Sequence, residues 1–335
     1  MRDLILYISL GLLVSFIILL LLFAEIPSAD DFSPDNPFYN GLSNFVYSFN
    51  VSRVATKDLS SISGEGSIVF IIGPSKNFTP DEAFAVKSFL DKGGILFIAD
   101  DYGTAQDLLN KLGVEIDFYK GVLRDPIFMY RSSYLPRVSI SLSTRNYSVY
   151  MNYGTALDIK DLGQGICLGY SSVFSFLEIQ GVNASEKING PLCVFYRINY
   201  GKGVIYVLSD SSIFINAMIG LGDNKRFIEE IIDSYVPYVI TDKWSTSLYT
   251  ETRLLFLNGL SYVMNSSYRY ILASLIIFAT YVSIDKLLVR SGRRVLEEEK
   301  DKLINHIINK HPDWDRRVLE RLFDEVLRNR RENRS

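Results

Sequence analysis

Histidine and cysteine are scarce in this sequence of 335 residues, which contains two of each. Both histidines, His306 and His311, lie near the carboxyl end. The long segment before them therefore has no Ser-His-Asp or Cys-His catalytic system and no zinc site of the usual histidine-containing kind. Lys202 stands between two glycines, but the Gly-x-x-x-x-Gly-Lys-Ser/Thr frame of a phosphate-binding loop is missing. We expect no metal and no cofactor.

The two cysteines, Cys167 and Cys193, both lie on predicted strands. Two interpretations of the pair remain open. In an oxidising exterior the thiols would form a disulfide, which stabilises a fold by roughly 3 kcal/mol through the entropy of loop closure. In the other interpretation both side chains are buried free thiols.

A strong excess of one charge is also lacking. The 35 basic and 38 acidic residues give a formal net charge of -3, which is not the balance of a nucleic-acid-binding protein. We therefore expect no nucleic acid among the partners.

Apolar residues, in contrast, are abundant. They make up 48% of the chain, and the mean hydropathy of +0.13 is unusual for a soluble protein. The excess lies in residues 4–24, which carry no charge, and in residues 270–284. An apolar stretch of about 20 residues is long enough to cross a bilayer. The pattern predicts transmembrane helices at 1–25 and 268–289.

Basic residues set the expected orientation of these spans. Lys286, Arg290, Arg293 and Arg294 follow the second span, and basic residues beside a span stay in the cytoplasm. This predicts a two-pass protein of the cell membrane, with both termini in the cytoplasm, the main domain outside, and the lipid bilayer as a partner. We expect the first span to be retained, because its apolar run is too long for a signal peptide and no Ala-x-Ala site follows directly.

The rest of the chain is organised around residues 66–113. Ser67 to Ile72 and Ile95 to Ala99 are apolar runs rich in β-branched residues, as strands buried on both faces are. Between them, Thr79 and Glu82 stand at the spacing of a helix-capping box. The pattern predicts a right-handed βαβ unit.

A third buried strand is predicted at Val204 to Leu208, which makes the fold class α/β with a parallel sheet and helices on both faces. Residues from about 115 to 200 alternate polar and apolar side chains and predict a β-rich insertion. The predicted domains are a transmembrane anchor at 1–25, a polar spacer at 26–37, an extracytoplasmic α/β domain at 38–265, a second transmembrane helix at 268–289 and a cytoplasmic helical tail at 290–335.

Acidic residues follow two of the predicted strands. Ligands of doubly wound sheets bind beyond the carboxyl ends of the strands, so these acids would share one crevice if their strands are neighbours. The structural alternative has more weight, because an Asp at a strand-to-helix turn usually caps the helix. The candidate crevice residues are Ser75, Asp100, Asp101, Asp210, Ser211 and Asn216.

The tail contains two helical patterns of apolar residues, broken at His311-Pro312. They predict either a helical hairpin that packs on itself or a docking face for a cytosolic protein, and we give both equal weight. The residues expected to contact such a partner are Trp314, Leu319, Leu322 and Phe323.

The predicted outer domain contains five glycosylation acceptor sequences of the form Asn-x-Ser/Thr, although roughly two or three would arise by chance. Their asparagines are Asn50, Asn77, Asn146, Asn183 and Asn265.

The stretch from Phe38 to Tyr235, with the segments YNGLSNF, LDKGGILFIADDYG and YGKGVIYVLSDSSIFINAMI, resembles the archaeal membrane-anchored family catalogued as domain of unknown function 4350. That family is similar in fold to class I glutamine amidotransferases, which implies a flavodoxin-like parallel sheet. The resemblance does not imply amidotransferase activity, because the turn from Asp100 to Gly103 has no nucleophilic cysteine. Members are often encoded beside AAA ATPases of the MoxR type, which implies such an ATPase as a partner.

Two functions remain in competition. The leading hypothesis is a membrane-anchored, non-enzymatic binding or scaffold domain whose tail contacts a cytosolic ATPase. The alternative is a hydrolase that acts on envelope glycans through paired carboxylates, with Asp100 or Asp101 and Asp210 as the candidate pair. Catalytic acids would lie in an open cleft, whereas capping acids would bind backbone amides.

Overall fold

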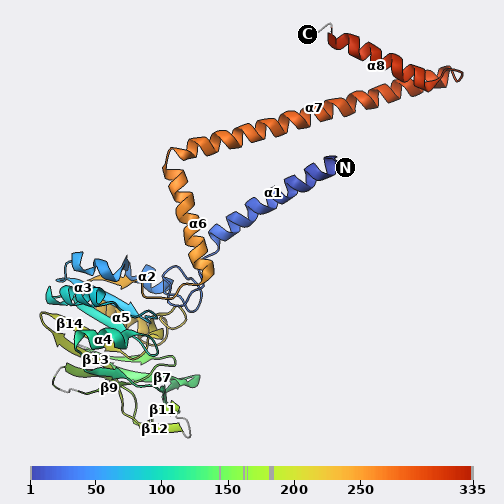
Figure 1. Cartoon of the computed structure of the whole chain (residues 1–335). Helices are drawn as coiled ribbons and strands as arrows, with labels where there is room; N and C mark the ends of the chain where they lie inside the picture. The colour runs from blue at the N-terminus through green and yellow to red at the C-terminus, as the bar shows by residue number, and fades with distance from the viewer. Residues whose placement is uncertain (1, 143–144, 161–162, 164, 181–184, 333–335) are drawn as a thin grey trace. The chain divides into compact units, whose positions relative to one another are not determined.

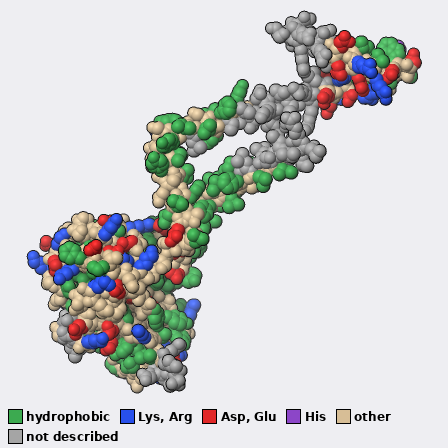
Figure 2. All heavy atoms as spheres, viewed as in Figure 1, with side chains coloured by type: hydrophobic (Ala, Val, Ile, Leu, Met, Phe, Trp, Pro, Cys, Tyr) green, Lys and Arg blue, Asp and Glu red, His purple; other side chains and the backbone are tan. Residues whose placement is uncertain are grey.

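The computed structural model describes residues 2–142, 145–160, 163, 165–180 and 185–332 (Figure 1). The chain divides into two compact units, Met1–Leu255 and Phe256–Ser335. The first unit contains the α/β domain. In the view of Figure 2, acidic and basic side chains are interspersed over this domain, so this face has no large area of a single charge.

Within the described residues, ten strands form one mixed sheet. One half of the sheet is parallel and the other half is antiparallel. The strands run in the order β1 (Ser52–Val54), β15 (Val236–Ile240), β2 (Ser67–Ile72), β3 (Ile95–Ala99), β14 (Gly203–Leu208), β13 (Cys193–Tyr200), β10 (Gly165–Tyr170), β7 (Ser132–Ser141) and β6 (Met129–Tyr130), while β8 (Asn146–Tyr150) pairs with β7.

Strands β2, β3 and β14 are parallel neighbours. This confirms the prediction of three buried parallel strands in one sheet. Every residue of β2 and β3 is buried, as their unbroken apolar sequences predict. The predicted fold class, which gives the domain a parallel sheet, is nevertheless wrong for the complete sheet. Strands of the insertion extend the sheet in antiparallel pairing.

Helices cover both faces of the parallel half. On one face, α3 (Pro80–Asp91) and α4 (Ala105–Leu112) pack against the alternate strand residues that include Val69 and Ile98. On the other face, α2 (Ser43–Phe49) and α5 (Asn224–Ile232) pack against those that include Phe70 and Phe97. The arrangement is three layers with the sheet in the middle.

Buried phenylalanines join the two halves of the sheet. Phe70 and Phe97 contact Phe214, and Phe97 contacts Phe195 of the first antiparallel strand, with ring centroids 5.5–5.8 Å apart. Aromatic pairs at such distances contribute about 0.5–1.5 kcal/mol each beyond the burial of their area. The insertion is therefore part of the same hydrophobic core.

The capping box predicted for α3 is confirmed. The Thr79 amide donates to Glu82 Oε2 at 2.7 Å, and the Glu82 amide donates to Thr79 Oγ1 at 3.3 Å. These two bonds satisfy amides that the first turn of a helix leaves without a partner. They also place the Glu82 side chain at the carboxyl end of β2.

Residues 115–200, predicted as a β-rich insertion, contain strands β4 to β13. Besides the strands of the large sheet they form two small antiparallel sheets. One consists of β12 (Ser185–Asn189), β11 (Phe176–Gln180) and β5 (Val122–Arg124), and the other of β4 (Ile116–Phe118) and β9 (Leu157–Ile159). Cys167 of β10 and Cys193 of β13 form a disulfide between neighbouring strands, with Cα atoms 6.1 Å apart.

The remaining helices complete the two units. Helix α1 (Arg2–Glu25) belongs to the first unit, whereas α6 (Leu248–Asn265) begins in the first unit and ends in the second. The hydroxyl of Tyr249, in the first turn of α6, donates to the carbonyl of Ile26 at 2.9 Å. Two short 3₁₀ helices lie at η1 (Thr56–Ser61) and η2 (Ser212–Phe214). The second unit contains α7 (Tyr268–Lys310) and α8 (Arg316–Glu332).

Among the described residues, no helix combines the length and the apolar character that crossing a membrane requires. The predicted spans at 1–25 and 268–289 are therefore wrong, and with them the two-pass cell-membrane localisation. The second apolar stretch is only the first part of a helix of 43 residues that continues through the charged sequence beyond Lys286.

Residues 26–37 do not form the expected loose spacer. Asn36 is fully buried, and its side-chain amide donates to the carbonyl of Asp30 at 2.9 Å and to Asn40 Oδ1 at 3.0 Å. The proline and aspartate content that indicated a linker instead belongs to a series of turns packed on the α/β domain.

Candidate functional site

Asp100 and Asp210 emerge side by side at the carboxyl edge of the sheet. Asp100 directly follows β3, Asp210 is separated from the end of β14 by Ser209 alone, and the Asp100 amide donates to the carbonyl of Leu208 at 3.0 Å. The next residues also meet, because Ser211 Oγ donates to Asp101 Oδ1 at 3.0 Å. The structure therefore brings four of the six predicted crevice residues together.

The chain turns in opposite directions after these two strands. After β3 it enters α4 on one face of the sheet, and after β14 it passes through η2 to α5 on the other face. Such a reversal is a topological switch point, where open α/β sheets form a crevice for ligands. The acids therefore lie at the position where such sheets commonly bind ligands.

Asp100 is used to shape the turn before α4. Its Oδ1 accepts the amides of Asp101 and Gly103, both at 2.9 Å, and its Oδ2 accepts the amide of Ala105 at 2.8 Å. A Cβ at Gly103 would lie 2.5 Å from Asp100 Oδ1, so the turn requires glycine. Burial raises the pKa of Asp100 to about 6, while the three amides act in the opposite direction.

Asp210 is closed off by the insertion. Its Oδ2 accepts the amide of Asn152 and its Oδ1 that of Ser212, each at 2.7 Å, and its side chain has no exposed area. Gly154 packs directly on it, since a Cβ there would lie 2.8 Å from the Cβ of Asp210. Burial, and then the negative charge of Asp101, raise the pKa of Asp210 well above its ordinary value.

Asp101 is the acid that remains accessible. Its Oδ1 accepts Ser211 Oγ and the amide of Tyr102 at 3.1 Å, whereas its Oδ2 accepts no hydrogen bond from a described residue. Burial raises the pKa of Asp101 as well. None of the three aspartates forms an ion pair with a Lys or Arg in the described part of the chain.

Asp101 lines a cavity of about 480 Å³ between the β3–α4 turn and the insertion. The wall is partly aromatic, with Tyr102 from the turn and Phe118 and Tyr119 from the insertion. Lys120, Val122 and Glu178 complete the side chains on the insertion side. The cavity therefore offers one carboxylate oxygen without a partner among apolar rings.

Hydrogen bonds between α4 and the insertion hold these walls in place. Gln106 Nε2 donates to the carbonyl of Ile116 at 2.8 Å, and its Oε1 accepts the amide of Phe118 at 3.0 Å. The Tyr102 hydroxyl donates to the carbonyl of Gly121 at 3.3 Å. Burial, followed by the charges of Asp101 and Asp210, raises the pKa of Tyr102 to about 12. The negative charges of these two acids therefore act on the Tyr102 hydroxyl.

The other two predicted crevice residues lie elsewhere. Ser75 Oγ is 2.9 Å from Ser245 Oγ and lines a separate cavity of about 530 Å³. The Asn216 side-chain amide donates to the carbonyls of Asn36 and Phe38 at 3.0 Å and 2.6 Å. Asn216 therefore fastens the segment before α2 to the domain and has a structural role.

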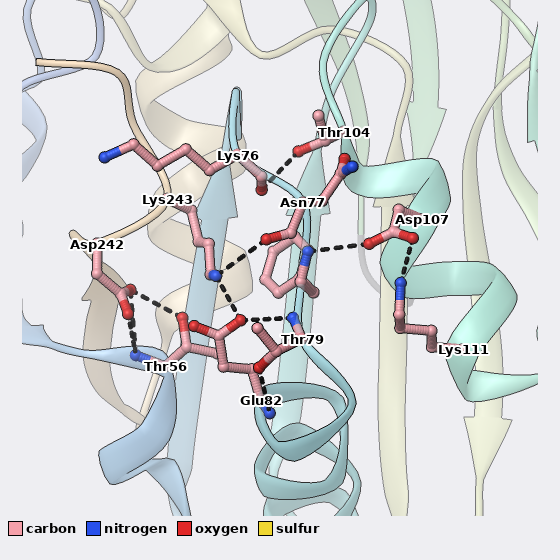
Figure 3. A network of polar contacts seen from close by, with 11 residues as sticks. Thr56, Lys76, Asn77, Thr79, Glu82, Thr104, Asp107, Lys111, Asp242 and Lys243 are labelled. Atoms are coloured by element: carbon pink, nitrogen blue, oxygen red, sulfur yellow. Dashed lines mark hydrogen bonds and ion pairs between the residues drawn. The ribbon is translucent and has the colours of Figure 1, made fainter.

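Beside the acids, at the ends of β2 and β15, lies a polar network that the sequence did not reveal (Figure 3). Lys243 is only 5% exposed. Its ammonium forms an ion pair with Glu82 and donates to the carbonyl of Asn77 at 3.2 Å, and it lies 4.9 Å from the centroid of the Phe78 ring. Asp242, its neighbour in sequence, accepts Thr56 Oγ1 at 2.8 Å.

Four of the five predicted glycosylation acceptors in the outer domain are exposed, and the fifth, Asn183, lies outside the described residues. The exposed acceptors are Asn50, Asn77, Asn146 and Asn265. No group of three or more His, Cys, Asp or Glu side chains in the described part of the chain is arranged to hold a metal ion.

In the tail unit, Leu319 and Ile304 are buried, while Trp314 and Leu322 are about half exposed. Phe323 is partly buried. Ion pairs join α7 to α8, including Lys300 with Asp324. These contacts form the self-packed hairpin, and apolar side chains remain on its surface.

No curated protein matches the chain. Among solved structures, the mmIFT52 N-terminal domain has 13% identity and a TM-score of 0.41, over 53% of this chain and 78% of that one. The cytoplasmic protein STM1381 from Salmonella typhimurium LT2 has 13% identity and a TM-score of 0.31, over 54% and 75%.

The exo-β-1,4-mannosidase Op5Man5 from Opitutaceae bacterium strain TAV5 has 11% identity and a TM-score of 0.25, over 50% of this chain but only 23% of the mannosidase. At TM-scores this low, none of these likenesses carries an argument about function. A family model, in contrast, matches residues 39–232, which make up more than half of the chain. The chain belongs to the family described as domain of unknown function DUF4350.

Proposed function

We propose that the α/β domain is a non-catalytic binding domain and that the cavity beside Asp101 is its ligand site. The observation that carries the proposal is the position of a cavity of about 480 Å³ at the point where the chain reverses between β3 and β14. The wall combines aromatic rings with polar and charged side chains, and a concave site that combines apolar surface with polar groups is typical of small-molecule binding.

The hydrogen bonds of the acids favour binding over hydrolysis. A glycoside hydrolase needs two carboxyl groups about 5 to 10 Å apart that both face the substrate. Asp100 and Asp210 instead accept backbone amides with both oxygens, and Asp210 has no exposed area. Of the three aspartates, only Asp101 has a carboxylate oxygen that accepts no hydrogen bond from a described residue, so the predicted pairs with Asp210 do not have the arrangement of a catalytic pair.

Filling the cavity tests the proposal. Val122 lines the cavity, so Val122→Trp would occupy it, while Val173→Trp adds the same ring at an exposed position outside it. We would measure thermal melts of the full chain and both variants with a panel of amines, polyols and carboxylic acids. A ligand at 100 times its Kd stabilises by about 2.7 kcal/mol, which raises Tm by several degrees.

We expect at least one class of compound to raise the Tm of the wild type and of Val173→Trp, but not that of Val122→Trp. A panel without any stabilising class, or equal responses of both variants, would refute the ligand site. Hydrolysis of aryl glycosides by the wild type that is lost in Asp101→Asn would instead support the carboxylate-dependent hydrolase.

We further propose that the tail hairpin binds a protein partner, an AAA ATPase of the MoxR type. The half-exposed Trp314 and Leu322 support this, because apolar side chains on a helix surface are typical contacts of a partner helix. With a purified MoxR-type ATPase from the same genome, Leu322→Asp should weaken binding at least ten-fold, whereas the exposed Lys302→Ala should not change it. Equal binding by both variants, or no binding by the wild type, would refute this contact.

A further inference from the structure

We infer that the cavity beside Asp101 binds an alkylammonium group, such as a free primary amine or the side chain of a lysine. This inference rests on the proposed function, because it names the class of ligand for the same site. The basis is an internal precedent, since the neighbouring part of the same sheet edge already holds an ammonium group.

Lys243 shows what this protein places around an ammonium group. Its Nζ contacts one carboxylate, that of Glu82, and one carbonyl, that of Asn77, and it lies over one aromatic ring, that of Phe78. A carboxylate supplies the opposite charge, and the face of a ring attracts a cation through its quadrupole. Together they make it possible to bury the Lys243 ammonium almost completely.

The cavity beside Asp101 has the same kinds of groups, but its Asp101 carboxylate forms no ion pair with an ammonium group of the described residues. Asp101 supplies a carboxylate with a free Oδ2, and Tyr102, Phe118 and Tyr119 supply rings. Asp100 and Asp210 add negative charge behind Asp101, and no described Lys or Arg is paired with any of the three. A cationic ligand would supply the missing opposite charge.

Two further charged side chains of the wall, Glu178 and Lys120, do not change this conclusion. Glu178 forms an ion pair with Arg124, so it adds little negative charge. Lys120 is exposed and forms no ion pair with a described residue. An anionic ligand would meet the uncompensated aspartates, and a neutral polyol would leave their repulsion unchanged.

The test uses the full chain and the probe Nα-acetyl-lysine amide. Its Nε-acetylated derivative is the neutral match, n-pentylamine is the free amine, and methyl glucoside represents polyols. Isothermal titration calorimetry should show the lysine amide binding at least ten-fold more tightly than its neutral match, because a hydrogen bond to a charged group contributes about 1.5–3 kcal/mol. Relative affinities of the lysine amide and pentylamine distinguish a peptide side chain from a free amine as the source.

Three variants assign the effect to the site. Asp101→Asn, which keeps the size of the side chain, should reduce affinity for the lysine amide at least ten-fold and abolish its advantage over the neutral match. Lys120→Met removes a like charge and should raise affinity two- to three-fold, which tests the inference even if Asp101→Asn is poorly folded. Asp81→Asn changes an exposed acid outside the cavity and should have no effect.

Failure of this inference and failure of the proposed function give different results. Binding of the glucoside or the neutral derivative that Val122→Trp blocks would leave the cavity as a ligand site but refute its preference for ammonium groups. Amine binding that is unchanged by Asp101→Asn and Lys120→Met would also refute the preference. If Val122→Trp blocks no probe, both the ligand class and the site are wrong.

Discussion

At the carboxyl edge of the parallel sheet, buried carboxylates have different partners in two neighbouring parts. At the ends of β2 and β15, the Glu82 carboxylate faces the Lys243 ammonium inside the protein (Figure 3). At the ends of β3 and β14, Asp101 and Asp210 repel each other without a described cation between them. The Glu82–Lys243 pair is neutral by itself, whereas the aspartates at the ends of β3 and β14 have no such partner among the described residues.

The difference separates a structural network from a candidate site. A buried carboxylate with an internal cation and a full set of hydrogen bonds holds the chain in place, as Glu82 does by capping α3. Carboxylates that repel one another reduce stability, and proteins retain such arrangements mainly at functional sites. The comparison therefore predicts opposite effects of removing charge from the two parts.

Removing the cation should have the largest effect. Lys243→Met leaves Glu82 partly buried without its partner, and breaking a buried pair costs about 3–5 kcal/mol. We expect about 3 kcal/mol in the free energy of unfolding, measured by urea denaturation of the full chain. The exposed Lys76→Met should change this free energy by less than about 0.5 kcal/mol.

The pH dependence of this effect has a definite sign. Burial raises the pKa of Glu82, but the hydrogen bond and charge of Lys243 outweigh burial and lower it. The pair therefore stabilises the fold above the unfolded pKa, and its contribution is lost as the pH falls through the lower, folded value. An equal cost of Lys243→Met at pH 7 and pH 3 would contradict the ion pair.

Removing the Asp210 side chain should have the next largest effect. Asp210→Ala leaves the amides of Asn152 and Ser212 without acceptors, which we expect to cost about 2 kcal/mol at pH 5. The pKa of Asp210 is raised in the folded state, so the wild type loses stability as the pH rises through that value, and the cost should shrink. A cost that grows with pH would show that Asp210 has a cation partner.

Much of this fold could be predicted from the sequence, because the signals are local. The apolar runs of β2 and β3 and the Thr79–Glu82 box depend on neighbouring residues, and both are confirmed. The pairing of β13 with β14 was missed, since an alternating strand pattern does not show which sheet it joins.

The candidate site was predictable only in part, for the same reason. Strand ends indicated Asp100, Asp101 and Asp210, but the wall formed by Phe118 and Tyr119 comes from the insertion, whose position depends on tertiary contacts. Lys243 lies in a loop where no sequence pattern indicates burial. The membrane prediction was wrong because an apolar stretch was interpreted without the helix that contains it.

A smaller effect of opposite sign is expected at Asp101. Asp101→Asn keeps an acceptor for Ser211 Oγ and removes a negative charge beside Asp210, so we expect the free energy of unfolding to rise by about 1 kcal/mol at pH 8. The gain should be smaller at pH 4 than at pH 8, because the raised pKa of Asp101 favours protonation of the wild-type carboxyl as the pH falls. Urea denaturation at both pH values provides the measurement, and a loss of stability at pH 8 would contradict the repulsion.

The smallest effect is expected at Ser211, whose hydroxyl donates one hydrogen bond to Asp101. Ser211→Ala should cost about 0.5–1 kcal/mol in the wild-type background, as a single hydrogen bond usually does. In the Asp101→Asn background the same change should cost less, because the acceptor is no longer charged. Equal costs in both backgrounds would show that the charge of Asp101 does not matter to this bond.

The central claim is that the part of the edge beside Asp101 lacks a cation that a ligand supplies, and proton release tests it most directly. Calorimetry of Nα-acetyl-lysine amide binding at pH 6.5, in two buffers of different ionisation enthalpy, counts the protons exchanged. Because a bound cation lowers the raised pKa values of Asp101 and its neighbours, the account predicts net release of protons by the wild type and less by Asp101→Asn. Net uptake of protons, or the same exchange in both proteins, would contradict it.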